Sequence, residues 1–247
     1  MSTLSVDQAK LIYMKTIGLI GGLSWESTQD YYRLINEGIR ESLGGLHSAE
    51  LILYSVDFEP IEQLQHIDDC EATAEILKDA AIKLEAGGAK FLLICSNTMH
   101  SVAPQVSEAV TIPLIHIADA TAAEIKRSGY QKIGLLGTSF TMERNFYKGR
   151  LEDVHHLEVI TPDQADRDLI HKVIYKELCL GSIVDTSKKE YLRIIHELAD
   201  KGAEAVILGC TEIGMLVKQS DTPVPLLDTT TIHAKAAVQF ALQLNGQ

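Results

Sequence analysis

Short, unbroken apolar runs recur along the chain, separated by longer segments in which apolar and polar residues mix with helical spacing. Runs of this length are typical of parallel strands that are buried on both faces. The pattern predicts strands over 15–20, 50–56, 91–94, 112–116, 132–136, 157–160, 205–208 and 224–227. Pro113 places the 112–116 strand at an edge or a bulge, because proline has no N–H to donate.

The segments between these strands predict helices. Four helices are expected over about 68–85, 102–108, 118–127 and 187–201. Three more are expected to begin near Trp25, with Ser24 as N-cap, near Met142 and near Thr230, and another is expected to end near Cys179. Residues 57–67 are expected to form a loop.

Strands that alternate with helices predict an α/β fold with parallel sheets and right-handed crossovers. The similar sequences Ile-Gly-Leu-Ile-Gly at 17–21 and Ile-Gly-Leu-Leu-Gly at 133–137 indicate a duplicated unit. We therefore expect a first, discontinuous domain over 14–117 plus 228–247, a second domain over 118–227, and an N-terminal extension over 1–13.

The composition, 46% hydrophobic and 23% charged residues, is that of a globular protein, and no apolar run reaches the ~18 residues of a membrane helix. A net charge of −12 argues against a nucleic-acid partner. The cysteines at 70, 95, 179 and 210 have neither the spacing of a zinc site nor the density of a disulfide scaffold. A cytoplasmic location is therefore expected.

Two polar motifs directly follow apolar strands: Cys-Ser-Asn-Thr at 95–98 and Gly-Cys-Thr-Glu at 209–212. In parallel sheets, ligands bind at the carboxyl ends of strands. The motifs therefore predict one site assembled between two similar halves, to which each half contributes a small reactive side chain.

Cys210 is the strongest single candidate for chemistry. Thr211 and Glu212 follow it and are expected to open a short helix, whose N–H groups would favour the thiolate over the thiol. A buried structural cysteine is the alternative interpretation. In the first motif, strand alternation sends Cys95 and Ser96 to opposite sides, so only one of the two should face the cleft.

Several motifs together resemble the aspartate/glutamate racemase family: Gly-Gly-Leu-Ser-Trp at 21–25, Asn-Thr-Met-His at 97–100, Gly-Cys-Thr-Glu at 209–212 and Asp-Thr-Thr-Thr-Ile-His at 228–233. The resemblance covers nearly the whole chain from Met14. It implies a cofactor-independent racemase, usually dimeric, of two Rossmann-like α/β domains related by pseudo-two-fold symmetry, with the active site in the cleft between them. The implied substrate is a small amino acid, aspartate or glutamate, and no metal ion is implied.

Racemisation removes the α-proton from one face of the carbon and returns a proton to the other, so two acid–base groups must flank the substrate. The family's usual Cys-Asn-Thr aligns on Ser96-Asn97-Thr98, which puts a hydroxyl where the resemblance implies a thiol. Serine is a poorer base than a thiolate. The hypothesis is that Cys210 removes the proton efficiently from one enantiomer, while Ser96 reprotonates the intermediate and works poorly in reverse.

The resemblance also implies the substrate contacts. Asn97, Thr98, Thr211 and Glu212 would hold the α-carboxylate and the ammonium. Leu23 and Gln65 would line the pocket, and Thr138 with Thr141 would contribute from the second half. Arg167 is the expected partner of a side-chain carboxylate, or alternatively a solvated charge on a helix face.

The remaining candidates have structural interpretations. His100, His116 and His233 stand near strand ends and are expected to support the site through hydrogen bonds rather than act as bases. Trp25 is expected in the core. A decarboxylase or a cis–trans isomerase of a diacid stays open, because each can work with one cysteine, and so does a non-catalytic protein that binds small acids.

Overall fold

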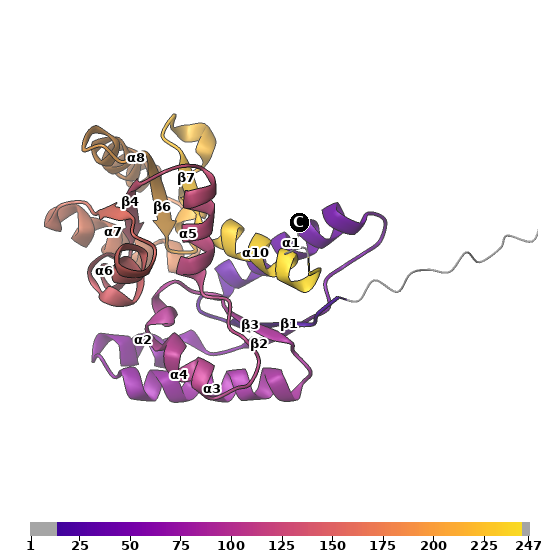
Figure 1. Cartoon of the computed structure of the whole chain (residues 1–247). Helices are drawn as coiled ribbons and strands as arrows, with labels where there is room; N and C mark the ends of the chain where they lie inside the picture. The colour runs from indigo at the N-terminus through magenta and orange to yellow at the C-terminus, as the bar shows by residue number, and fades with distance from the viewer. Residues whose placement is uncertain (1–13, 244–247) are drawn as a thin grey trace, which may run out of the picture.

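The computed structural model describes residues 14–243, which form two β-sheets with helices packed around them (Figure 1). All paired strands run parallel, which confirms the expected α/β fold class. The predicted extension over 1–13 lies outside the described residues. Within 14–243, no helix combines the length and the apolar character needed to cross a membrane.

The first sheet contains β1 (Ile17–Gly21), β2 (Leu51–Ser55) and β3 (Phe91–Ile94) in the order β2-β1-β3. β1 and β3 are buried along their whole length, as expected for unbroken apolar runs. A single bridge between Leu92 and Leu114 continues the pairing beyond β3.

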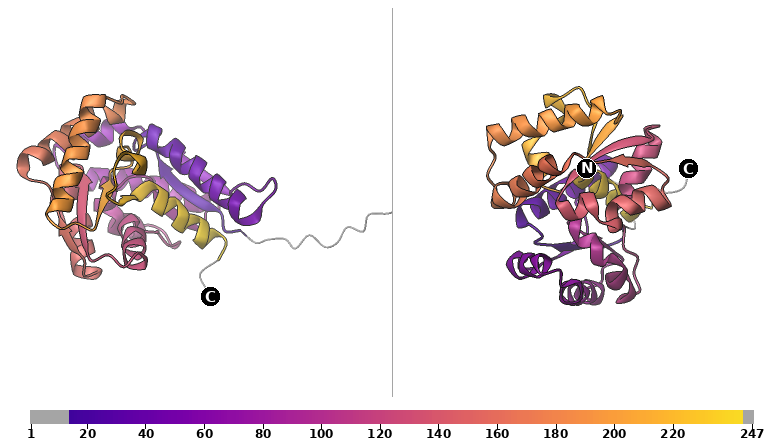
Figure 2. Two further views of the ribbon diagram at one scale, coloured as in Figure 1. Left: turned by 90° about the horizontal axis from the view of Figure 1, so that it is seen from above. Right: turned by 90° about the vertical axis from the view of Figure 1, so that its left-hand side faces the viewer.

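Helices cover both faces of this sheet. They are α1 (Trp25–Leu43), α2 (Phe58–His66), α3 (Cys70–Ala86), the 3-10 helix η1 (Thr98–Val102), α4 (Ala103–Glu108) and α10 (Thr229–Ala241). α1 and α10 lie side by side (Figure 1, Figure 2), and Tyr31 and Ala237 share a core with Ile17 of β1. α3 and α4 pack on the opposite face, where Leu77 and Val106 share a second core.

The second sheet contains β4 (Lys132–Gly137), β5 (Glu158–Ile160), β6 (Ala205–Gly209) and β7 (Leu226–Asp228) in the order β5-β4-β6-β7. One continuous core joins these strands to their helices. The helices are α5 (Ile117–Arg127), α6 (Ser139–Glu143), the π-helix η2 (Asn145–Val154), α7 (Gln164–Lys176), η3 (Leu178–Leu180), α8 (Asp185–Asp200), α9 (Ile213–Leu216) and η4 (Gln219–Asp221).

The two sheets repeat one plan. β1 lies between β2 and β3, and β4 lies in the same way between β5 and β6. The chain passes into the second half near Ile117, at the start of α5, and α10 returns to the core of the first half. The domain division at 117 and 228 stays a prediction.

Some expectations about the elements were wrong. The expected loop over 57–67 contains α2, because Asp57 caps it by accepting a hydrogen bond from the Glu59 N–H at 3.4 Å and Ile61 is buried beneath it. Pro60 is tolerated there because the first turn of a helix needs no internal donor. The expected strand over 112–116 is reduced to one bridge, consistent with the missing N–H of Pro113.

Two further expectations need correction. The helix expected from Met142 begins at Ser139 instead, because the Thr138 hydroxyl caps it and accepts from the Thr141 N–H at 3.2 Å. Trp25 was expected in the core but is 62% exposed. It begins α1 on the side away from the buried residues Tyr31 and Ile35.

Candidate active site

A small cleft lies between the two sheets, at the carboxyl ends of their strands. Its lining comes from both halves of the chain: Leu23, Phe58, Gln65, Ser96 and Thr98 from the first, and Thr138, Ile174, Tyr175, Cys179, Cys210, Thr211 and Glu212 from the second. The two strand-end motifs therefore meet in one cavity.

Ser96 presents its side chain to the cleft directly after β3. Its carbonyl oxygen lies 2.7 Å from Nδ1 of His100, and its Oγ accepts a hydrogen bond from the Met99 N–H at 3.4 Å. Cys95 is completely buried in the core with Ile17, and this burial raises the pKa of its thiol. Of the two neighbours, only Ser96 lines the cleft.

Asn97 ties the motif to α10, and Thr98 joins it to the second half. The Asn97 side chain is buried and donates to the Thr229 hydroxyl at 3.0 Å, and its Oδ1 has no hydrogen-bond partner among residues 14–243. Asn97 itself does not line the cleft. The Thr98 hydroxyl lies 3.1 Å from that of Thr138 and 3.4 Å from that of Thr141.

Cys210 follows β6, and its side chain is tied to a buried carboxylate. Its thiol donates to Oε2 of Glu212 at 2.8 Å, and the Thr211 hydroxyl donates to the same oxygen at 3.0 Å. Oε1 of Glu212 accepts from the hydroxyl of Ser24, the N-cap of α1, at 2.7 Å. Glu212 is only 2% exposed, so its negative charge is held by donors from both halves.

The prediction that a helix N-terminus favours the thiolate form of Cys210 is wrong. Burial, followed by the negative charge of Glu212, raises the pKa of the Cys210 thiol well above its usual value. α9 begins only at Ile213 and spans four residues, so it offers little dipole to oppose these effects. Cys210 is therefore a thiol that donates to Glu212.

Several lining residues were not predicted from the sequence. Phe58 comes from α2, which was expected to be a loop, and Ile174 and Tyr175 come from the end of α7. The Tyr175 hydroxyl donates to Oε1 of Gln65 at 3.2 Å, which ties α7 to α2 across the cleft. The apolar spacing of α7 was visible in the sequence, but its contact with the other half was not.

Arg167 does not line the cleft. It lies near the start of α7, where Nε pairs with Oε1 of Glu143 at 2.8 Å and Nη1 donates to the Pro162 carbonyl at 2.7 Å. The Arg167 charge is therefore paired at the start of a helix, with 21% of its side chain exposed. Its proposed contact with substrate has no support from the geometry.

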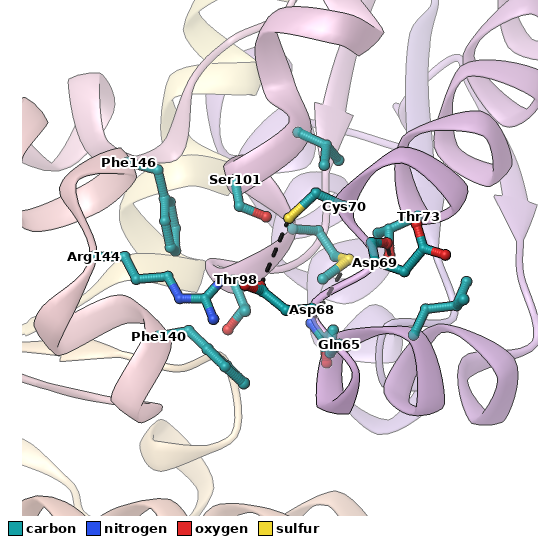
Figure 3. A pocket seen from close by; sticks show the side chains of 13 residues that line it. Gln65, Asp68, Asp69, Cys70, Thr73, Thr98, Ser101, Phe140, Arg144 and Phe146 are labelled. Atoms are coloured by element: carbon teal, nitrogen blue, oxygen red, sulfur yellow. Dashed lines mark hydrogen bonds and ion pairs between the residues drawn. The ribbon is translucent and has the colours of Figure 1, made fainter.

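A second small pocket adjoins the cleft and shares Gln65 and Thr98 with it. Figure 3 shows Arg144 and Phe140 on one side of this pocket, facing Asp68 on the other. Arg144 pairs with Asp68 at 2.7 Å and stacks over the Phe140 ring at 4.6 Å. It is the one Lys or Arg among the described residues that line either cavity.

The cleft thus offers a thiol with a carboxylate acceptor and, from the other half, a hydroxyl held by a backbone N–H. These groups suit proton transfer at a substrate carbon between them. Among residues 14–243, no cluster of three or more His, Cys, Asp or Glu is arranged to hold a metal ion.

The fold and the comparisons with known proteins define an isomerase. The chain belongs to the Asp/Glu/hydantoin racemase family, whose model matches residues 20–237. This match spans both sheets and both motifs, so the resemblance seen in the sequence is confirmed.

Similar proteins share nearly the whole length of the chain. A candidate Asp/Glu racemase from Yersinia pestis is 55% identical, with a TM-score of 0.87 over 93% of this chain and 100% of that one. An aspartate racemase homologue from Pyrococcus horikoshii OT3 is 37% identical, with a TM-score of 0.80 over 92% and 99%. The broad-specificity amino-acid racemase of Bacillus subtilis strain 168 is 22% identical over 92% of this chain and 98% of its own.

Proposed function

We propose that the chain is a cofactor-independent amino-acid racemase in which Cys210 and Ser96 act on opposite faces of the α-carbon. The observation that supports this most strongly is that Cys210 and Ser96 line one cleft, each at the carboxyl end of a strand of its own half, β6 and β3. Two proton-transferring groups around one small cavity are what inversion of a carbon centre requires.

Cys210 begins as a thiol, so it must lose its proton before it can act as a base. Glu212 Oε2 already accepts the hydrogen bond of this thiol at 2.8 Å and is placed to receive the proton. The ammonium group of a bound amino acid would bring positive charge into the buried cleft and stabilise the thiolate. The thiolate then removes the α-proton, and N–H and hydroxyl groups around the carboxylate stabilise the carbanion.

Ser96 supplies the proton to the other face. Its hydroxyl can donate, and the Met99 N–H at 3.4 Å supports the oxygen as negative charge develops. In the reverse reaction the same oxygen must act as a base, which is unfavourable for an unactivated hydroxyl. Inversion in both directions passes through this Ser96 step, so Ser96 limits inversion, while proton removal by Cys210 is faster.

The α-carboxylate and ammonium need polar partners at the strand ends of both halves. Thr98, Thr138 and Thr211 line the cleft with hydroxyl groups, and Asn97 is buried between two lining residues. We assign the α-carboxylate to the three hydroxyl groups and the ammonium to the neighbourhood of Glu212. Leu23 and Gln65 complete the wall contributed by the first half.

The substrate side chain would face a neutral wall. Phe58, Ile174 and Tyr175 line the cleft, and the described lining includes the carboxylate of Glu212 but no Lys or Arg. A second substrate carboxylate would therefore be buried without a cation, which costs several kcal/mol. This favours amino acids with uncharged side chains. Broad specificity is also the name given to the Bacillus subtilis relative.

Aspartate and glutamate, the substrates implied by the family resemblance, are the second candidates. They are favoured by one observation: Arg144 lies in the pocket that shares Gln65 and Thr98 with the cleft. To reach a substrate carboxylate, Arg144 would have to leave Asp68. Replacing Arg144 with Gln should then raise KM for aspartate and leave KM for alanine unchanged.

The experiment follows α-proton exchange and chirality together in deuterium oxide. The substrates are L- and D-alanine, -serine, -methionine, -aspartate and -glutamate, observed by proton NMR and chiral chromatography. We expect one enantiomer to exchange its α-proton at least tenfold faster than it inverts, because Cys210 can return a deuteron to the face from which it took the proton. The other enantiomer should invert about as fast as it exchanges.

The variants separate the two sides of the cleft. Ser96→Ala should abolish inversion and keep the fast exchange, Cys210→Ala should abolish both, and Ser96→Cys should make both enantiomers exchange rapidly. Inversion that survives in Ser96→Ala contradicts the role of Ser96.

No exchange with any amino acid, combined with turnover of a diacid, would indicate the decarboxylase or cis–trans isomerase. Binding without exchange would indicate a non-catalytic protein. We also propose that the protein is the homodimer that the family resemblance implies, and its mass in analytical ultracentrifugation tests this.

A further inference from the structure

His100 is buried directly behind the turn that carries Ser96. It is 1% exposed and belongs to η1, four residues after Ser96. Its Nδ1 lies 2.7 Å from the Ser96 carbonyl oxygen, and its Nε2 lies 3.2 Å from the backbone nitrogen of Ile117. The imidazole therefore joins the catalytic turn of the first half to the first residue of α5, where the chain enters the second half.

These contacts define the state of the ring. The Ile117 N–H can only donate, so Nε2 must be its unprotonated acceptor. Nδ1 then carries the proton and donates it to the Ser96 carbonyl. Burial and the neighbouring His116 ring, whose centroid is 4.5 Å away, hold the pKa of His100 well below its usual value, which keeps the ring neutral.

The neighbours Cys95, Asn97 and Thr98 are each anchored by hydrogen bonds, but Ser96 itself makes few others. The Ser96 N–H donates to the Ile94 carbonyl at 2.8 Å, and the long Met99 contact reaches Oγ at 3.4 Å. The short His100 bond is thus the main restraint on the Ser96 carbonyl from outside its own turn. A displacement of about 1 Å in a reacting group can cost 10²-fold in rate.

We propose that His100 is a positioning residue, which holds the Ser96 hydroxyl where it can reprotonate the substrate, through the hydrogen bond from Nδ1 to the Ser96 carbonyl. This rests on the proposed racemase function and adds a specific consequence. The ring touches the Ser96 turn and not Cys210. Loss of the Nδ1 bond should therefore slow inversion and leave the fast exchange at Cys210 intact.

Two substitutions separate the two nitrogens of the ring. His100→Asn places an amide N–H near the position of Nδ1 and keeps the bond to Ser96, whereas His100→Gln places a polar atom near Nε2 and loses that bond. We expect His100→Gln to lower the inversion rate about tenfold, the effect of one lost hydrogen bond, with unchanged exchange of the fast enantiomer. His100→Asn should keep the wild-type ratio of exchange to inversion.

The matched control is His233→Gln. His233 is also fully buried and its ring lies 5.8 Å from that of His100, but it contacts Tyr31 and the Ile115 carbonyl rather than the Ser96 turn. This change should leave the ratio of exchange to inversion as in wild type. In a Ser96→Ala background, where inversion is already abolished, His100→Gln should leave the fast exchange at Cys210 unchanged.

A measurement on the unsubstituted protein tests the contact independently of any variant. Nitrogen-15 NMR of labelled histidine should show His100 neutral, with the proton on Nδ1. A proton on Nε2, an imidazolium ring, or equal losses of exchange and inversion in His100→Gln would each overturn the proposal. An absence of exchange in the wild-type protein would contradict the racemase function instead, and the ring state would still report on the Ser96 contact.

Discussion

Glu212 is the residue at which the two halves share a buried charge. Its oxygens accept hydrogen bonds from Ser24 of the first half and from Cys210 and Thr211 of the second. A carboxylate that is 2% exposed needs such donors, because an unpaired buried charge is costly. Burial, and after it the same charge, raises the pKa of Cys210, so the group that can receive the thiol proton also helps to keep the thiol protonated until substrate arrives.

Glu212→Gln should therefore change thiol ionisation and catalysis in opposite directions. The amide keeps the shape of the side chain and removes the charge, so the pKa of Cys210 should fall and alkylation of its thiol near neutral pH should accelerate. Racemase turnover should fall at least tenfold, because the amide cannot take up the thiol proton. The measurement pairs the pH dependence of iodoacetamide labelling at Cys210 with deuterium exchange.

Glu177→Gln is the control for this prediction. Glu177 accepts a hydrogen bond from the Ser187 hydroxyl at 2.7 Å and has no hydrogen bond to Cys210 or Glu212. Its loss should leave the labelling profile of Cys210 unchanged. A Cys210 pKa that rises in Glu212→Gln would show that the carboxylate stabilises the thiolate, which is the reverse of our assignment.

At the scale of elements, the turn between β1 and α1 places Leu23 and Ser24 at the cleft. Gly22 makes this turn possible, with a φ of +83° and no room for a side chain. A Cβ at this position would lie 2.2 Å from the Val56 carbonyl oxygen and 2.7 Å from the Val56 nitrogen. Both atoms belong to backbone directly after β2, so they cannot move without disturbing the sheet edge.

Gly22→Ala should therefore lower the free energy of unfolding by more than its positive φ alone explains. The control is Gly129→Ala, since Gly129 also has a positive φ, +79°, but no atom within 4 Å of a built Cβ. We expect a loss of about 1–2 kcal/mol for Gly129→Ala and at least about 3 kcal/mol for Gly22→Ala. Urea unfolding measures both, and equal losses would contradict the steric argument.

Elements that depend on local sequence were predictable, and contacts between elements were not. β1, β3, β4 and β6 followed from unbroken apolar runs because each is buried on both faces. α2 was missed because the Asp57 cap was read as part of a loop. The Tyr175–Gln65 contact and the position of Arg167 depend on how the halves pack, and no spacing within one element encodes that.

At the scale of the molecule, the half-buried His116 and the buried His233 lie where the chain crosses between its halves. His116 caps α5, where its Nδ1 accepts a hydrogen bond from the Ala118 N–H at 3.2 Å. Nδ1 of His233 lies 2.9 Å from the Tyr31 hydroxyl, and its Nε2 lies 2.9 Å from the Ile115 carbonyl oxygen. Burial, with the positive charge of Arg150, lowers the pKa of His116 to about 4. Burial, together with electrostatic repulsion from the His100 ring, lowers the pKa of His233 to about 3.

These lowered pKa values predict that acid unfolds the protein. Above about pH 6.5 the histidines are neutral in both the folded and the unfolded chain, so they contribute no pH dependence. Below that pH the unfolded chain binds protons that the folded protein cannot accept, until about pH 4 for His116 and about pH 3 for His233. Stability should fall by about 1.4 kcal/mol per pH unit for each histidine in this window.

Urea unfolding at pH 7, 6 and 5 measures this slope, and His233→Gln tests its origin. The amide does not titrate, so the variant should lose less stability between pH 6 and pH 5, by about 1.4 kcal/mol for one titrating group. Burial alone would raise the pKa of the Asp119 carboxyl, but hydrogen bonds from Arg150 and His155 lower it to about 2. Protonation of Asp119 therefore affects stability mainly below pH 5. An unchanged slope in His233→Gln would mean that groups away from the crossing between the halves determine acid stability.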